Sequence, residues 1–207
     1  MTFPISRLWL ALPLILAAFL MPVSRAEAGP IVSSATNCDD ETLEQPFAAW
    51  GDPADYFLVP DGSFSGGADG WQLSKANVVA ENRPHSSHAE TDAALRIPMG
   101  SSVTSPAVCV GLLHPTLRFF ARNDGSPLDT LSVEVLFEDA GGNVHALPIG
   151  VALASGKWQP TLPLPVVANL LALLPGERTA VSFRFTAHGL GRAWLIDDVY
   201  VDPYGRG

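Results

Sequence analysis

From Phe47 onward the sequence consists of short apolar runs separated by Gly, Pro, Asn and Asp, and in several of these runs apolar and polar residues alternate. The clearest are residues 117–122, 131–138 and 181–186, where every second side chain is apolar. Because successive side chains of a β-strand point to opposite faces, we predict strands with one face in a core and the other in water. Residues 123–125 (Asn-Asp-Gly) and 140–143 (Ala-Gly-Gly-Asn) are typical of turns between such strands.

Further short apolar runs are separated by Gly, Pro, Asn and Asp, and they predict additional strands. These cover residues 56–59, 71–74, 77–80, 94–98, 101–104, 107–110, 144–148, 158–162 and 194–201. One short helix is expected over residues 166–174, between Pro165 and Pro175. With no linker in between, residues 47–207 are predicted to form a single all-β domain, a jelly-roll β-sandwich of two antiparallel sheets.

Residues 1–28 have the features of a secretory signal peptide. Arg7 precedes an apolar run over residues 8–23, and Ala26 and Ala28 are the small residues of a cleavage site. The run is shorter than the roughly 20 residues of a membrane span and contains prolines, although an N-terminal anchor helix is the alternative. We therefore expect a secreted, extracellular protein without a membrane span after signal removal, starting with a polar arm over residues 29–46.

Composition and charge narrow the function classes. The 207 residues include 21 Asp and Glu against 12 Lys and Arg, for a net charge of −9, which disfavours a nucleic-acid partner. A hydrophobic content of 47% argues against a disordered chain. In an oxidising compartment the only two cysteines, Cys38 and Cys109, are expected to form a disulfide.

Two sets of motifs carry a resemblance to known families. Residues 60–64 (PDGSF) and 70–74 (GWQLS), with the ending 194–201 (WLIDDVYV), resemble the first and last strands of carbohydrate-binding-module-like jelly rolls, the galactose-binding-like superfamily. Residues 115–122 and 197–204 resemble segments of an uncharacterised family of secreted bacterial proteins, which brings no function with it. The jelly-roll resemblance implies that the first and last strands lie near one another and that the domain binds a glycan.

The closing motif also predicts a local irregularity. Ile196 and Val199 are three residues apart, so if both are buried, Asp197 and Asp198 must sit at a β-bulge or bend. Carboxylates at such a position accept backbone N–H bonds or hold a hard cation.

The resemblance further implies a structural Ca²⁺ where the first and last strands meet. Ser65 stands where relatives have an acidic ligand, so Asp197 or Asp198 would have to bind the ion with the Gly62 carbonyl and Asp61. The alternative is that the Asp pair only forms hydrogen bonds at the strand ends, and no cofactor is then needed.

Candidate ligand-binding residues are few. Sugar rings stack on exposed aromatic faces, and Trp50, in a Pro- and Gly-rich segment, is the best candidate, whereas Trp71 and Trp194 are expected in the core. His85 and His88 belong to a polar loop, 82–92, that could border a ligand groove.

No catalytic motif is found, neither a nucleophile elbow nor a zinc-protease helix. We therefore predict a secreted, non-catalytic module that recognises a glycan or cell-envelope polymer. The alternatives are a structural or adhesive envelope protein with a protein partner, and a glycan-active hydrolase on the same scaffold. The oligomeric state is not predicted.

Overall fold

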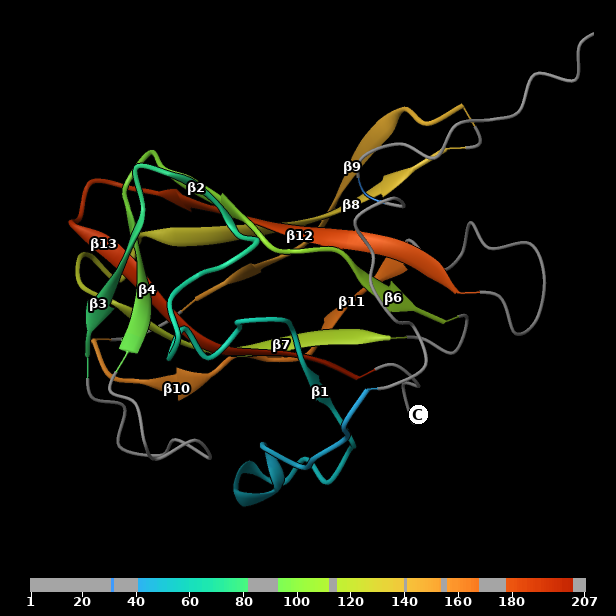
Figure 1. Cartoon of the computed structure of the whole chain (residues 1–207). Coiled ribbons are helices and arrows are strands. Elements are labelled where there is room, and N and C mark those ends of the chain that lie inside the picture. Colours follow the sequence, from blue (N-terminus) through green and yellow to red (C-terminus); the bar gives the residue numbers. More distant parts are fainter. Residues whose placement is uncertain are drawn as a thin grey trace, which may run out of the picture.

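The computed structural model describes residues 31, 41–81, 93–111, 115–139, 141–153, 156–167 and 178–202. These residues form two antiparallel sheets that pack face to face (Figure 1), which confirms the predicted all-β sandwich. A single 3-10 turn, Ala48–Trp50, lies among the described residues. Most of the helix predicted over 166–174 falls outside them. No helix in the described part of the chain has the length and apolar character needed to cross a membrane.

The first sheet has seven strands, with the order β10-β7-β13-β4-β3, while β1 pairs with β13 and β11 with β7. Its strands are β1 (Phe57–Leu58), β3 (Asn77–Ala80), β4 (Ala93–Pro98), β7 (Thr116–Asn123), β10 (Gln159–Pro160), β11 (Leu164–Pro165) and β13 (Ala193–Asp202). The first and last strands are neighbours, since Phe57 faces Val201 and Leu58 faces Tyr200. This is the proximity that the jelly-roll resemblance implies.

The second sheet has six strands, with the order β2-β5-β12-β8-β9, and β6 also pairs with β12. Its strands are β2 (Gln72–Ser74), β5 (Ser102–Thr104), β6 (Val108–Val110), β8 (Thr130–Glu138), β9 (Val144–Ala152) and β12 (Thr179–His188). The two long central strands, β8 and β12, pair over eight successive positions.

The core lies between the two sheets and follows the alternation in the sequence. Phe119 of β7 meets Phe185 of β12 edge to face, with ring centroids 5.2 Å apart. Trp71 packs against both Phe64 and Phe185, and its indole N–H donates to the carbonyl of Pro60. Trp71 and Trp194 are both buried, as predicted. Each large side chain of this kind stabilises the sandwich by about 2 kcal/mol or more through burial alone.

The outer face of β7 and β13 is buried as well, so the expectation that it meets water is wrong. The segment before β1 folds across this face, and its Phe47 and Tyr56 pack on Phe120 and Tyr200. In Figure 1 this segment is the blue-to-teal chain at the bottom, which leads into β1. Alternation predicted which residues share a face, but a short-range pattern carries no information about a distant segment that covers that face.

The bulge predicted in β13 is present. The pairing of β13 with β7 shifts between Asp197, opposite Phe120, and Tyr200, opposite Arg118. Ile196 and Val199 are both fully buried, and Asp198 has a left-handed φ of 47°. The bulge also separates two partners of β13, because β4 pairs with residues before it and β1 with residues after it.

Candidate functional site

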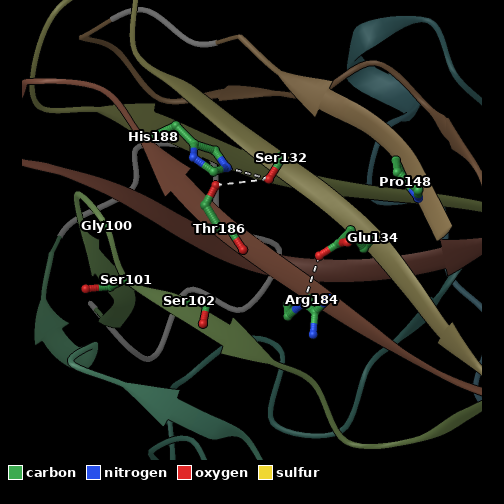
Figure 2. A pocket seen from close by; sticks show the side chains of 9 residues that line it. All are labelled: Gly100, Ser101, Ser102, Ser132, Glu134, Pro148, Arg184, Thr186 and His188. Atoms are coloured by element: carbon green, nitrogen blue, oxygen red, sulfur yellow. Dashed lines mark hydrogen bonds and ion pairs between the residues drawn. The ribbon is translucent and has the colours of Figure 1, made fainter. Parts of the chain in front are cut away.

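A groove of about 500 Å³ lies on the outer face of the six-stranded sheet. Nine residues from the strands β5, β8, β9 and β12 and from the turn before β5 line it (Figure 2): Gly100, Ser101, Ser102, Ser132, Glu134, Pro148, Arg184, Thr186 and His188. Most of them carry hydrogen-bonding side chains. The groove thus combines hydrogen-bonding groups with apolar surface, on the outer side of a sheet whose inner face belongs to the core.

Strand register places these side chains side by side. On β12, Arg184 lies opposite Glu134 of β8 on one side and Thr104 of β5 on the other. Two residues further along β12, Thr186 lies between Ser132 of β8 and Ser102 of β5. Since every second residue of a strand points to the same face, the polar positions of three strands form successive rows across the sheet.

Two hydrogen-bonded pairs hold the groove side chains in place. The Arg184 Nε donates to Glu134 Oε2 at 2.7 Å, and both side chains are partly exposed, at 35% and 25%. The Ser132 hydroxyl lies 2.8 Å from His188 Nε2 and also reaches the Thr186 carbonyl at 3.4 Å. Figure 2 shows the two pairs next to each other along β8 and β12. Because these side chains are already held in place, less side-chain entropy is lost when a ligand binds.

The border of the groove on β9 is shaped by a second bulge. Val133 faces Gly150 and Glu134 faces Pro148, so Ile149 is an extra residue in β9. Its side chain is buried, and a Cβ on Gly150 would lie only 2.7 Å from Leu164 Cδ2. The bulge bends β9 beside Glu134 and gives this edge of the groove its shape.

A small part of the same outer face is covered. Ile31 packs on Leu136 of β8 and Ala107, and its backbone N–H is hydrogen-bonded to Glu138. Leu136 is therefore covered, whereas Glu134 and Arg184 of the same face remain partly exposed.

A separate polar cluster is found at the turn between β8 and β9. Hydrogen bonds from the His145 ring and from Asn143 hold the pKa of Asp139 well below its ordinary value. The same carboxylate accepts the backbone N–H groups of Gly141 and Asn143. Asp139 thus organises an exposed hairpin turn, and the cluster is not continuous with the groove lining.

The residues selected from the sequence do not converge on this groove. Trp50 is 38% exposed and packs edge to face on Phe120, on the outer side of the other sheet. His85 and His88 lie outside the described residues. Cys109 is buried on β6, and the described part of the chain contains no free cysteine. Because Cys38 is outside that part, its pairing with Cys109 stays a prediction.

The residues selected for calcium lie near the bulge of β13. Asp61 is exposed at a turn with φ 52°, whereas Asp197 and Asp198 are buried. The Gly62 carbonyl accepts the Val199 N–H at 3.1 Å, and Asp197 Oδ1 accepts the Asp198 N–H at 2.7 Å. Within the described ranges, no three His, Cys, Asp or Glu side chains gather in a way that could hold a metal ion. Calcium binding here stays a prediction, since Ca²⁺ takes six to eight oxygen ligands and backbone carbonyls count among them.

Sequence reasoning missed the residues that line the groove. It identified Ser132 and Glu134, and likewise Arg184 and Thr186, as polar faces of two strands, but His188 is isolated in the sequence and gives no signal. The sequence does not reveal the register of β8 against β12, which places residues about 50 positions apart opposite each other.

Comparison with known proteins gives structural neighbours only. No family model and no curated protein matches the chain. A solved tailspike domain of bacteriophage CBA120, described as enzymatically active, is 16% identical, with a TM-score of 0.48 over 70% of this chain and 21% of that chain. The CBM22-1 and GH10 modules of a Clostridium thermocellum xylanase are 13% identical, with a TM-score of 0.49 over 70% of this chain and 28% of that chain.

A third neighbour is the CBM22-1 xylan-binding domain from Paenibacillus barcinonensis. It is 15% identical, with a TM-score of 0.47 over 70% of this chain and 94% of that chain. The present chain thus spans about a quarter of the first two neighbours and nearly all of the third. Carbohydrate-binding modules are among its structural neighbours.

Proposed function

We propose that this protein is a secreted, non-catalytic module that binds a glycan in the groove on the outer face of β5, β12 and β8. The observation that carries the proposal is the register of this sheet, which lines one open groove with hydroxyl, carboxylate, guanidinium and imidazole groups. Sugar hydroxyls both donate and accept hydrogen bonds, and such a mixed set of groups serves both roles.

The groove supports binding more than hydrolysis. Most glycosidases use two carboxyl groups on either side of the scissile bond. Glu134 is the one carboxylate among the nine residues that line the groove, and it is engaged by Arg184. Apart from the imidazole of His188, the lining has no aromatic ring, so binding here would depend on hydrogen bonds more than on ring stacking.

Export and the disulfide belong to the same proposal. Residues 1–28 would direct the chain out of the cytoplasm, and Cys38 would then pair with Cys109 on β6 and tie the N-terminal arm to the sandwich. The arm makes contacts consistent with this, since Ile31 packs on the second sheet and Glu44 accepts the Tyr200 hydroxyl at 2.7 Å.

A glycan array followed by calorimetry with residues 29–207 tests the function. Thr186→Val removes a hydroxyl from the groove at nearly constant volume, and we expect glycan affinity to fall about fivefold. Thr179→Val, at the other end of β12 and outside the groove lining, is the matched control and should bind like the natural protein. Folded protein that binds no glycan would refute the proposal.

The second candidate function is that of an envelope component with a protein partner. Leu128 and Leu190 are 87% and 101% exposed, and their loops are held together because Asp129 Oδ1 accepts the Leu190 N–H at 3.0 Å. Exposed apolar side chains at one end of a sandwich favour a protein contact. Pull-down with envelope extracts, compared with Leu190→Ser, tests this alternative.

A further inference from the structure

The groove is formally neutral in an otherwise acidic protein, because its one cation, Arg184, is paired with its one carboxylate, Glu134. The chain has a net charge of −9, yet the lining combines Arg184 and His188 with a single carboxylate, Glu134. All other polar side chains in the lining are neutral hydroxyls. An anionic ligand therefore meets less electrostatic repulsion here than the net charge of the whole chain would suggest.

Within the described part of the chain, the guanidinium of Arg184 makes a hydrogen bond to the protein through only one of its three nitrogen atoms. Its Nε binds Glu134 at 2.7 Å, and within the described residues Nη1 and Nη2 have no hydrogen-bond partner. A guanidinium is a planar fork that can bind one carboxylate along its Nε edge and a second along its Nη edge. Glu134 thus holds Arg184 in one orientation and leaves the Nη edge for another group.

The remaining groove residues suit the neutral part of such a ligand. Arg184 and His188 are four residues apart on β12, about 13 Å along the strand, which is longer than one sugar ring. Between them lie the hydroxyls of Thr186 and Ser132, and Ser102 lines the opposite side (Figure 2). This arrangement provides hydroxyl recognition next to a site for one carboxylate.

We propose that the groove selects glycans that contain uronic acid residues, with the sugar carboxylate bound by the Nη edge of Arg184. The proposal rests on the function proposed above and specifies its ligand class. Glu134 acts as the positioning residue for Arg184, while Ser132, Thr186 and His188 contact the sugar hydroxyls.

The test uses matched pairs of ligands. Residues 29–207 are titrated by calorimetry with oligogalacturonate, oligomannuronate and glucuronate-bearing xylan oligosaccharides, each paired with its carboxyl-reduced, neutral form. We expect at least one acidic member to bind about tenfold more tightly than its neutral form, as a charge-assisted bidentate contact is worth that much. Arg184→Gln should abolish this preference while circular dichroism shows unchanged strand content.

The control is Arg178→Gln, which removes the same charge just before β12, where Arg178 bonds to Glu41 and not to the groove. It should retain the preference for the acidic form. Equal affinity for both members of every pair would overturn the uronate proposal and leave glycan binding intact. Tighter binding of sulfated than of carboxylated oligosaccharides would also overturn it. Failure to bind any glycan, acidic or neutral, would refute the proposed function itself.

Discussion

Arg118 of β7 and Asp52 of the segment before β1 form an ion pair on the outer face of the seven-stranded sheet. The Arg118 guanidinium lies over the ring of Phe47 at 4.4 Å, and its Nε also donates to the Thr161 carbonyl at 2.7 Å. One arginine thus joins three segments that are far apart in the sequence. This contact keeps the N-terminal segment over an apolar face that would otherwise be exposed.

Removing the carboxylate should weaken the attachment of this segment and destabilise the protein. Burial opposes ionisation of Asp52, but hydrogen bonds from Tyr56, Ala54 and Arg118 outweigh it and lower the pKa of Asp52. Asp52→Ala leaves Arg118 without its anionic partner, and we expect the free energy of unfolding to fall by about 2–3 kcal/mol in urea titrations. Asp69→Ala, at an exposed position, should change it by less than about 0.5 kcal/mol. Equal effects of the two substitutions would contradict this role.

Ionisation of the Tyr56 hydroxyl should destabilise the folded protein at high pH. Burial, together with a hydrogen bond to Asp52, raises the pKa of Tyr56 from 10.0 to about 12. Because the pKa is higher in the folded than in the unfolded chain, the stabilisation is complete below pH 10 and is lost as the pH rises toward 12. Urea unfolding at several pH values should show this decline, and Tyr56→Phe should be less sensitive to pH over the same interval.

Asp129 fills a site that leaves no room for a side chain at position 191. A Cβ on Gly191 would lie 2.1 Å from Asp129 Oδ2 and 2.7 Å from Gly125 Cα. Gly191→Ala should therefore lower the free energy of unfolding by about 2 kcal/mol. Gly156→Ala is the matched control, since its nearest neighbour would be 3.9 Å away, and it should be close to neutral. Similar melting temperatures for both variants would argue against this packing.

The predicted disulfide can be tested by reduction. If Cys38 is bonded to Cys109, the cross-link removes chain entropy from the unfolded state by an amount equivalent to about 4 kcal/mol. We expect dithiothreitol to lower the melting temperature of secreted protein and peptide mapping to recover the two cysteines in one linked fragment. Cys38→Ser should melt like the reduced protein. Two alkylatable thiols in native protein would refute the pairing.

Calcium is expected to have no effect on stability. The Gly62 carbonyl and Asp197 Oδ1 already accept backbone N–H bonds, which is the alternative that the sequence left open for this Asp pair. Melting temperatures in EDTA and in excess Ca²⁺ should therefore agree. If Ca²⁺ raised the melting temperature and Asp197→Asn removed this increase, a metal site at the bulge would be established.

The sequence determined the strands and even the bulge of β13. Alternation located β7, β8 and β12 closely, because side-chain direction in an extended chain is a local property. The spacing of Ile196 and Val199 predicted the irregularity at Asp197 and Asp198, since two residues three apart cannot face the same side of a regular strand, and both belong to the core between the sheets.

Only the tertiary structure decided which polar faces form a site. Arg184 meets Glu134, and Ser132 meets His188, because β8 and β12 pair in one particular register, and no local pattern specifies that register across so many intervening residues. In the same way, Phe47 covers Phe120 on one sheet while the groove on the other remains open. The candidate site is therefore the groove and not Trp50. Its position depends on long-range packing, that is, on shape and pairing between distant segments.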